Sequence, residues 1–282
     1  MRFLKGYEIY ENKSDIDSIC KKYHIKDYTI NTDGSIDVGN YVNLYKKGLS
    51  KLPIKFGRVN GDFACDGNRL ITLEGSPTDV IGDFSCDNNK LSSLEGGPIR
   101  VSGGYFCYQN TLKTLKGSPE VVGQTFNCED NSITSLKYGP KKVRTFDCGY
   151  NELTTLVGCS TIITENFWCD CNELTTLKGC PDIHGDLSCI GNTIVSLEFI
   201  PKIGGNFNYD DNPIYYIIGR NSNDRELFND ADIIRFDSDT DDIKINKPVI
   251  IYDRLKWFCE ETGRELDEFS LKVIEEYYRV IK

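Results

Sequence analysis

Residues 63–73 read FACDGNRLITL, and residues 84–94 read FSCDNNKLSSL. Both segments place a cysteine two residues after a phenylalanine, an asparagine three residues later, and leucines five and eight residues after the cysteine. The arrangement recurs every 20 or 21 residues, and its central residues, called the ladder positions below, are Leu44, Cys65, Cys86, Cys107, Cys128, Cys148, Cys169, Cys189 and Tyr209. Self-similarity at such a period predicts a solenoid in which each repeat stacks on the next.

Each position in the repeat has a physical reason. We expect one short strand per repeat, with the aromatic residue and the cysteine both facing the core, and parallel strands about 4.8 Å apart. The asparagine can satisfy backbone groups where the strand bends, and a stack of asparagines would form a second ladder. The asparagines are Asn68, Asn89, Asn110, Asn131, Asn151, Asn172, Asn192 and Asn212.

The pattern Φ-x-C-x-x-N-x-L-x-x-L resembles a leucine-rich repeat over residues 40–217. The short period and a return segment that often contains proline are most similar to the bacterial repeats of the YopM-like and IpaH-like effectors. Cys- and Asn-bearing repeats of uncharacterised phage and bacterial proteins are also similar. The resemblance implies an α/β fold, a curved right-handed solenoid with a parallel sheet on its concave face. Cysteine replaces the usual aliphatic residue, and the roughly 65 residues after position 217 are too few for a ubiquitin-ligase domain.

The remaining segments predict caps, so we divide the chain into residues 1–39, 40–217 and 218–282. Ser14 precedes a short amphipathic helix, and residues 28–30 and 35–38 around the turn at 31–34 predict a β-hairpin. Residues 218–249 are acidic and irregular. Residues 250–261 and 266–281 have helical spacing of apolar residues, with Phe269, Val273, Ile274, Tyr277 and Tyr278 on one face.

Composition limits the function classes. The chain has 282 residues, 39% of them hydrophobic, and a formal net charge of −10. The negative charge argues against direct binding to nucleic acid or to an anionic membrane. No apolar run approaches the roughly 20 residues that cross a bilayer, and residues 1–6 do not begin a secretory signal. We therefore expect a cytoplasmic protein.

The twelve cysteines do not predict a metal site or a cofactor. Zinc requires four converging ligands, whereas seven of these cysteines run in a line with one per repeat. Cys159 and Cys180 share a second register and could touch, so a disulfide under oxidising conditions stays open. Cys171 should face outward as the most reactive thiol, or simply as an exposed bystander. Residues 237–241 resemble the start of an EF-hand loop, but Asp242 and Pro248 stand where glycine and glutamate are needed.

Few features of the sequence indicate a catalytic function. The two histidines, His24 and His184, lie in the N-terminal cap and in a return turn, and no phosphate-loop, zincin or nucleophile-elbow motif occurs. Carboxylates are plentiful, but no pair of them stands out. We therefore expect a protein that is not an enzyme.

The outward positions of the predicted strands carry an uneven charge. These are the residues three and one before each ladder position and one and two after it. Over the eight repeats from Cys65 onward they include eleven acids and no Lys or Arg. The acids are Asp62, Asp66, Asp83, Asp87, Glu129, Asp130, Asp147, Asp170, Asp186, Asp210 and Asp211. Four aromatic residues share the face, namely Phe106, Tyr108, Tyr150 and Trp168. The acids could merely keep the face soluble, but stacked acids repel and exposed aromatics oppose solubility.

The sequence thus predicts a non-catalytic module that binds a protein partner with a basic surface. Phe106, Tyr108, Tyr150 and Trp168 would be anchors, and Asp66, Asp87, Glu129, Asp130, Asp147, Asp170 and Asp210 would steer the partner. Three alternatives stay open: a decoy that mimics nucleic acid for a DNA-binding protein, a structural part of a larger assembly, and an enzyme with its site in the caps or in residues 218–249. The partner's identity and the oligomeric state are left open.

Overall fold

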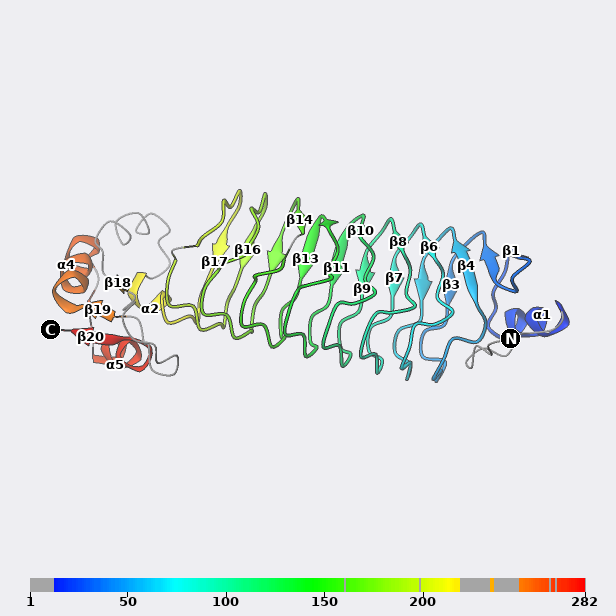
Figure 1. Ribbon diagram of the computed structural model, residues 1–282, viewed down its shortest axis with the longest axis horizontal. Coiled ribbons are helices and arrows are strands. Elements are labelled where there is room, and N and C mark those ends of the chain that lie inside the picture. Colours follow the sequence, from blue (N-terminus) through cyan, green and yellow to red (C-terminus); the bar gives the residue numbers. More distant parts are fainter. Residues whose placement is uncertain are drawn as a thin grey trace.

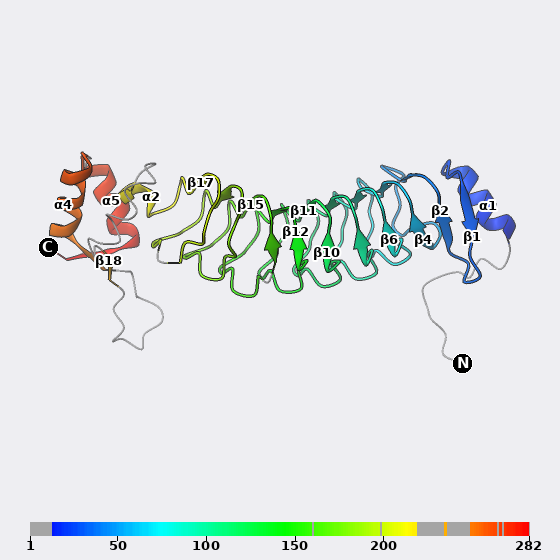
Figure 2. The same cartoon turned by 90° about the horizontal axis from the view of Figure 1, so that it is seen from above.

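The computed structural model describes residues 13–159, 161–197, 199–218, 234–235, 249–263, 265–266 and 268–281. The repeats form a β-solenoid of parallel strands, an elongated rod with short strands on two of its faces (Figure 1). Seen at right angles, the rod is gently bowed along its length (Figure 2). No helix among the described residues is long and apolar enough to cross a membrane.

The coils contribute strands to two sheets, although the last two coils join the first sheet only through isolated bridges at Ile183 and Ile203. The first, called the valine sheet, runs β1 (Tyr28–Ile30), β2 (Ile36–Val38), β4 (Phe56–Val59), β6 (Asp79–Val80), β8 (Arg100–Val101), β10 (Val121–Val122), β12 (Lys142–Val143), β14 (Ile162–Ile163). The second, called the aromatic sheet, runs β3 (Val42–Asn43), β5 (Phe63–Ala64), β7 (Phe84–Ser85), β9 (Tyr105–Phe106), β11 (Thr125–Asn127), β13 (Thr145–Asp147), β15 (Phe167–Trp168), β16 (Leu187–Ser188), β17 (Phe207–Asn208). Among the described strands of these two sheets, β1 and β2 alone pair antiparallel, which confirms the predicted hairpin.

The prediction of one strand per repeat is wrong, because the valine sheet supplies a second one. A strand such as Asp79–Val80 has two residues and buries only the valine. Strand alternation becomes visible in a sequence over four or more residues, so a single buried valine gives no strand signal. Between β3 and β17 the described residues form strands and turns but no helix.

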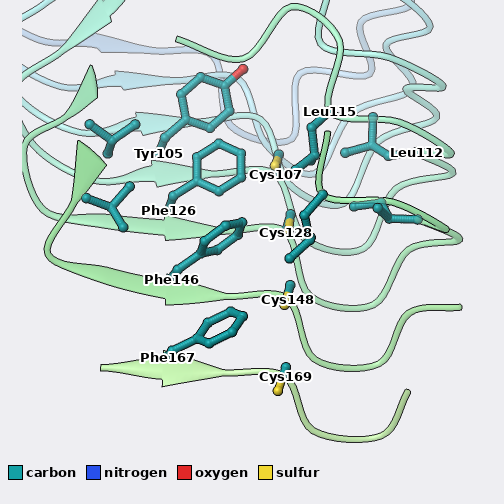
Figure 3. Close-up of a cluster of buried hydrophobic side chains, with 14 of the residues drawn as sticks. Tyr105, Cys107, Leu112, Leu115, Phe126, Cys128, Phe146, Cys148, Phe167 and Cys169 are labelled. Carbon is teal, nitrogen blue, oxygen red and sulfur yellow. The ribbon is translucent and has the colours of Figure 1, made fainter. Parts of the chain in front are cut away.

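The core consists of parallel rows of side chains from equivalent positions of successive coils (Figure 3). Rings of the aromatic sheet follow one another from coil to coil with centroids 4.9–5.6 Å apart from Phe63 to Phe167. Phe56, on β4 of the valine sheet, packs edge-on against Phe63 at 4.9 Å. The seven ladder cysteines form the next row, and each is 0% exposed. All twelve cysteines are free thiols, Cys159 and Cys180 included. The predicted buried cysteine ladder is confirmed.

The asparagine ladder is confirmed as well. Asn131 Nδ2 donates to the carbonyls of Cys107 and Cys128, both at 3.1 Å, and Asn131 Oδ1 accepts from the Leu112 N–H at 3.0 Å. One side chain therefore joins its own coil to the preceding one. The other seven asparagines make the same set of contacts. Because the bend would otherwise leave buried backbone groups without partners, these amides stabilise every coil.

The two ends carry the helices. At the N-terminal end, α1 (Lys13–Lys22) buries Ile16 and Cys20. At the C-terminal end lie α2 (Tyr215–Ile218), α4 (Tyr252–Thr262), α5 (Glu268–Tyr277) and a small sheet of β18 (Ile234–Arg235), β19 (Val249–Ile251) and β20 (Arg279–Ile281). The predicted helix over 266–281 is wrong beyond Tyr277, because the β-branched residues after it pair with β19 instead. The EF-hand-like stretch 237–248 lies outside the described residues.

Candidate acidic and aromatic face

The aromatic sheet defines a face whose rows are in strict register. Every strand of this sheet ends at the residue before its ladder position, so these residues form one outward row. In order the row is Asn43, Ala64, Ser85, Phe106, Asn127, Asp147, Trp168, Ser188 and Asn208. The residues one and two after each ladder position lie beyond the strand ends, in the bend. The prediction that all four positions share a strand face is therefore wrong for those two.

The residue two after each ladder position has a left-handed backbone conformation in all nine coils. The φ angles of the non-glycine residues Lys46, Asn88, Gln109, Asp130, Tyr150, Cys171 and Asp211 are 50–57°, and glycines fill the other two places. This conformation is costly for residues with a Cβ. It turns the chain while keeping cross-coil hydrogen bonds, such as Tyr150 N–H to the Asp170 carbonyl at 2.9 Å. The left-handed bend therefore determines the direction of the Tyr150 side chain, which is 57% exposed.

Three of the predicted surface acids are structural. Asp62, Asp83 and Asp186 lie at the bend between the two sheets, where each accepts a backbone N–H from the following coil. Asp83 N–H donates to Asp62 at 2.9 Å, and Gly104 N–H donates to Asp83 at 2.6 Å. Asn206 N–H donates to Asp186 at 2.7 Å. Each of these carboxylates gives a backbone N–H at the bend a fixed acceptor, which accounts for the three acids without any partner.

Two of the predicted steering acids are buried. Asp147 is 9% exposed and accepts from Gly149 N–H at 3.1 Å and from Asn127 Nδ2 at 3.2 Å. Asp87 is 7% exposed. Burial raises the pKa of each carboxyl to about 6, with Asp66 adding to the effect at Asp87 and Glu129 adding to it at Asp147. The expectation that both lie freely on the surface is wrong, because neighbouring coils cover them.

The other predicted acids differ in their accessibility. Asp170 is half-buried and accepts from Ser188 Oγ at 2.5 Å and from Ile190 N–H at 2.7 Å. Asp66 is half-buried, and burial raises its pKa. Glu129 is half-buried and Asp130 is exposed. Asp210 is half-buried and lies two coils beyond Asp170, so it is separated from the centre of the face.

The four aromatic anchors flank a polar centre. Phe106, Asn127, Asp147 and Trp168 are consecutive neighbours in the outward row, so two polar side chains separate the two rings. Trp168 is 37% exposed, whereas Phe106 is half-buried.

In the adjacent row, Tyr108 is followed by Glu129, and both Tyr108 and Tyr150 feel the Glu129 charge. We call the set Phe106, Tyr108, Glu129, Asp130, Asp147, Tyr150 and Trp168 the central face.

Basic side chains are engaged elsewhere. Arg100 pairs with Asp79 at 2.5 Å, Lys116 with Glu95 at 2.9 Å and Lys141 with Glu120 at 2.6 Å, each across one coil and away from the aromatic sheet. The single exception on the bend of this sheet, among the nine coils, is Lys46. It belongs to the Leu44 coil, which precedes the eight repeats that carry eleven acids and no Lys or Arg at their outward positions.

The described residues contain no group of three or more His, Cys, Asp and Glu side chains that could hold a metal ion. Comparison with protein-family models, with curated proteins and with solved structures finds no match for the chain.

Proposed function

We propose that the protein is a non-catalytic binding module whose central face docks a protein partner with a basic surface. One observation carries the proposal: exposed aromatics flank carboxylates that no lysine or arginine of the described central coils faces. Asp147 feels the charges of Glu129 and Asp170 as well as its own burial, which together raise its pKa. A basic side chain placed there by a partner would relieve that repulsion.

The anchors fit the energetic pattern of protein interfaces. Binding energy concentrates in a few aromatic side chains at the centre of a polar rim. Trp168 and Tyr150 are the most exposed aromatics of the central face, and Trp168 stands directly beside Asp147. A partner that covers the indole would also exclude water from the neighbouring carboxylates, which strengthens their attraction for a cation.

The test compares two tryptophans. The protein has only Trp168 on the central face and Trp257 on α4, and both are partly exposed. A partner captured with the wild-type protein is purified, and its dissociation constant is measured for the wild type, Trp168→Ala and Trp257→Ala. We expect about 2 kcal/mol of lost binding, roughly a thirty-fold weaker dissociation constant, for Trp168→Ala alone. An unchanged constant for Trp168→Ala removes the central face from the interaction.

The salt dependence of the association rate isolates the electrostatic contribution to binding. If the acids steer the partner, the association rate should fall steeply as salt rises from low to physiological concentration, while the dissociation rate changes less. A flat salt profile would argue against the acids. Free duplex DNA is included as a competitor, because competition for the same partner would favour a decoy that mimics nucleic acid.

We also propose that the coil is a variant of the short bacterial leucine-rich repeat, in a cytoplasmic protein. The period, the asparagine ladder and the two leucines of each return segment support that relationship. The valine sheet is the feature that sets these coils apart from the single strand per repeat that the resemblance implies.

A further inference from the structure

Towards the N-terminal coils, the row of Tyr108 and Glu129 carries two carboxylates between two tyrosines. Tyr45, Asp66, Asp87 and Tyr108 each follow a ladder position in four successive coils. The backbone fixes their stacking, because Lys46 N–H donates to the Asp66 carbonyl at 3.2 Å and Gly67 N–H to the Asp87 carbonyl at 3.0 Å. Neighbouring strands lie about 4.8 Å apart, so the four side chains follow one another closely.

A hollow of about 420 Å³ lies over this row. Besides these four residues it is lined by Asn43, Lys46, Ala64, Gly67, Asn88 and Gln109. Lys46 is therefore the one basic residue of the lining. The hollow is open to solvent and mainly polar, with a tyrosine at either end, which suits a charged side chain rather than an apolar one.

One end already holds an ammonium group. Lys46 Nζ lies 4.9 Å from the centroid of the Tyr45 ring, within the range of a cation–π interaction, and it is attracted to Asp66. Gly67 makes this arrangement possible. A Cβ on Gly67 would lie 2.8 Å from Lys46 Cγ and 3.0 Å from Tyr45 Cε2, so any other residue would displace them.

At the other end of the hollow, Asp87 and Tyr108 again place a carboxylate beside a tyrosine, but no basic residue of the lining accompanies them. Asp87 is nine-tenths buried and forms no ion pair within the described part of the chain. Tyr108 forms a hydrogen bond with this carboxyl, whereas the neighbouring charge of Asp66 repels it. The buried thiols of Cys65, Cys86 and Cys107 are the other titratable groups beside it, and none of these groups is a base. Burial and the Asp66 charge raise its pKa, so the ionised carboxylate is under-compensated at neutral pH and an added cation would stabilise it.

We propose that the Asp87 and Tyr108 end of this hollow binds the ammonium group of a lysine side chain from a protein partner, as the Tyr45 and Asp66 end binds Lys46. The idea that the partner is a basic protein rests on the function proposed above. Lys46 supplies the precedent for ammonium rather than guanidinium. Lys46 also repels an incoming ammonium group, so it tunes the affinity of the hollow.

The test uses the full chain and a tetralysine peptide at low salt, with backbone amide shifts in NMR spectra giving the site and the dissociation constant. Asp87→Asn preserves shape and removes a buried charge, so the variant should fold. We expect it to bind tetralysine about ten-fold more weakly, and Tyr108→Leu a few-fold more weakly. Lys46→Met should bind more tightly. Glu152→Gln, an exposed acid on a return segment, matches the change in net charge and should alter binding less than about two-fold.

Three outcomes overturn the proposal. Asp87→Asn and Glu152→Gln could weaken binding equally, which would mean that only net charge matters. The shifted amides could lie away from Gly67 and Asn88, and tetraarginine could bind more tightly than tetralysine. Trp168→Ala separates the two proposals, because the central face and the hollow share only Tyr108. The variant should leave tetralysine binding unchanged. An unchanged affinity for the purified partner would remove the Trp168 end of the central face from the interaction, while the hollow would still stand.

Discussion

Asp147 and Trp168 are register partners on β13 and β15, so the main aromatic anchor of the central face stands directly beside a carboxylate that is nine-tenths buried. The two side chains therefore act differently. Trp168 is accessible enough to be contacted by a partner, whereas Asp147 can contribute through its charge without being touched.

Loss of one rung of the asparagine ladder should be strongly destabilising. Asn151 Nδ2 donates to the carbonyls of Cys128 and Cys148 at 3.0 and 3.1 Å, and Asn151 Oδ1 accepts from Ile133 N–H at 2.9 Å. Asn151→Ala would leave these buried groups without partners, so the free energy of unfolding should fall by about 3 kcal/mol or more in urea titrations. Asn208→Ala, on an exposed strand position, should change it by less than about 0.5 kcal/mol. Equal effects would contradict the role of the ladder.

Removal of a hydroxyl should have opposite effects at two tyrosines. The Tyr105 hydroxyl is buried between the rings of Phe84 and Phe126 with no nitrogen or oxygen partner, and only the weakly bonding thiol of Cys86 lies beside it. Tyr105→Phe should therefore raise the free energy of unfolding, by about 1 kcal/mol. The Tyr278 hydroxyl donates to the Val195 carbonyl at 2.9 Å and joins the C-terminal helices to the last coils. Tyr278→Phe should lower stability by about 1–2 kcal/mol, and a loss at Tyr105 would show that its hydroxyl has a partner.

Stability should rise as the pH falls from 7 towards 4, and Asp147 should account for part of the change. Its folded-state pKa is raised to about 6, while an unfolded aspartate titrates near pH 4. Between these values the folded state binds more protons, so lowering the pH favours folding. Asp147→Asn should be more stable than the wild type at pH 7.5, with the difference shrinking towards pH 4 in parallel urea titrations. A difference that does not vary with pH would contradict the raised pKa.

Thiol reactivity should divide the cysteines into two classes. The seven ladder cysteines are fully buried, and burial raises their pKa values, so their thiolates should not form in the folded protein. Cys171, Cys159 and Cys180 are partly exposed. Ellman's reagent should therefore label a few thiols in the native state, with Cys171→Ser removing the fastest phase, and the ladder thiols only after unfolding. Rapid native labelling of the ladder would contradict the packing.

The sequence predicted the interior far better than the surface. The positions of Cys107 and Asn131 in the period were enough to place one in the core and the other at the bend. The valine sheet was missed because its strands are two residues long. The left-handed bend was missed because residues as different as Tyr150 and Gly67 occupy it, and only the backbone reveals what they share.

The candidate site shows the same division. The sequence brought Phe106 and Trp168 to one face, because equal positions in a period lie in one row. It treated Asp83, Asp87 and Asp130 as equivalent surface acids, although one accepts a backbone N–H, one is buried and one is exposed. The hollow around Asp87 was also missed, since it depends on the Leu44 coil, where Tyr45 and Lys46 break the acidic pattern.

The sequence by itself determined the repeat, its inward-facing side chains and the asparagine ladder, because a period of 20 or 21 residues repeats one local solution and each coil buries the same face. Only the tertiary structure decided which acids remain accessible. The exposure of an outward side chain depends on residues one coil away and on the backbone bend that directs it. Neither can be predicted from the residues next to it in the sequence.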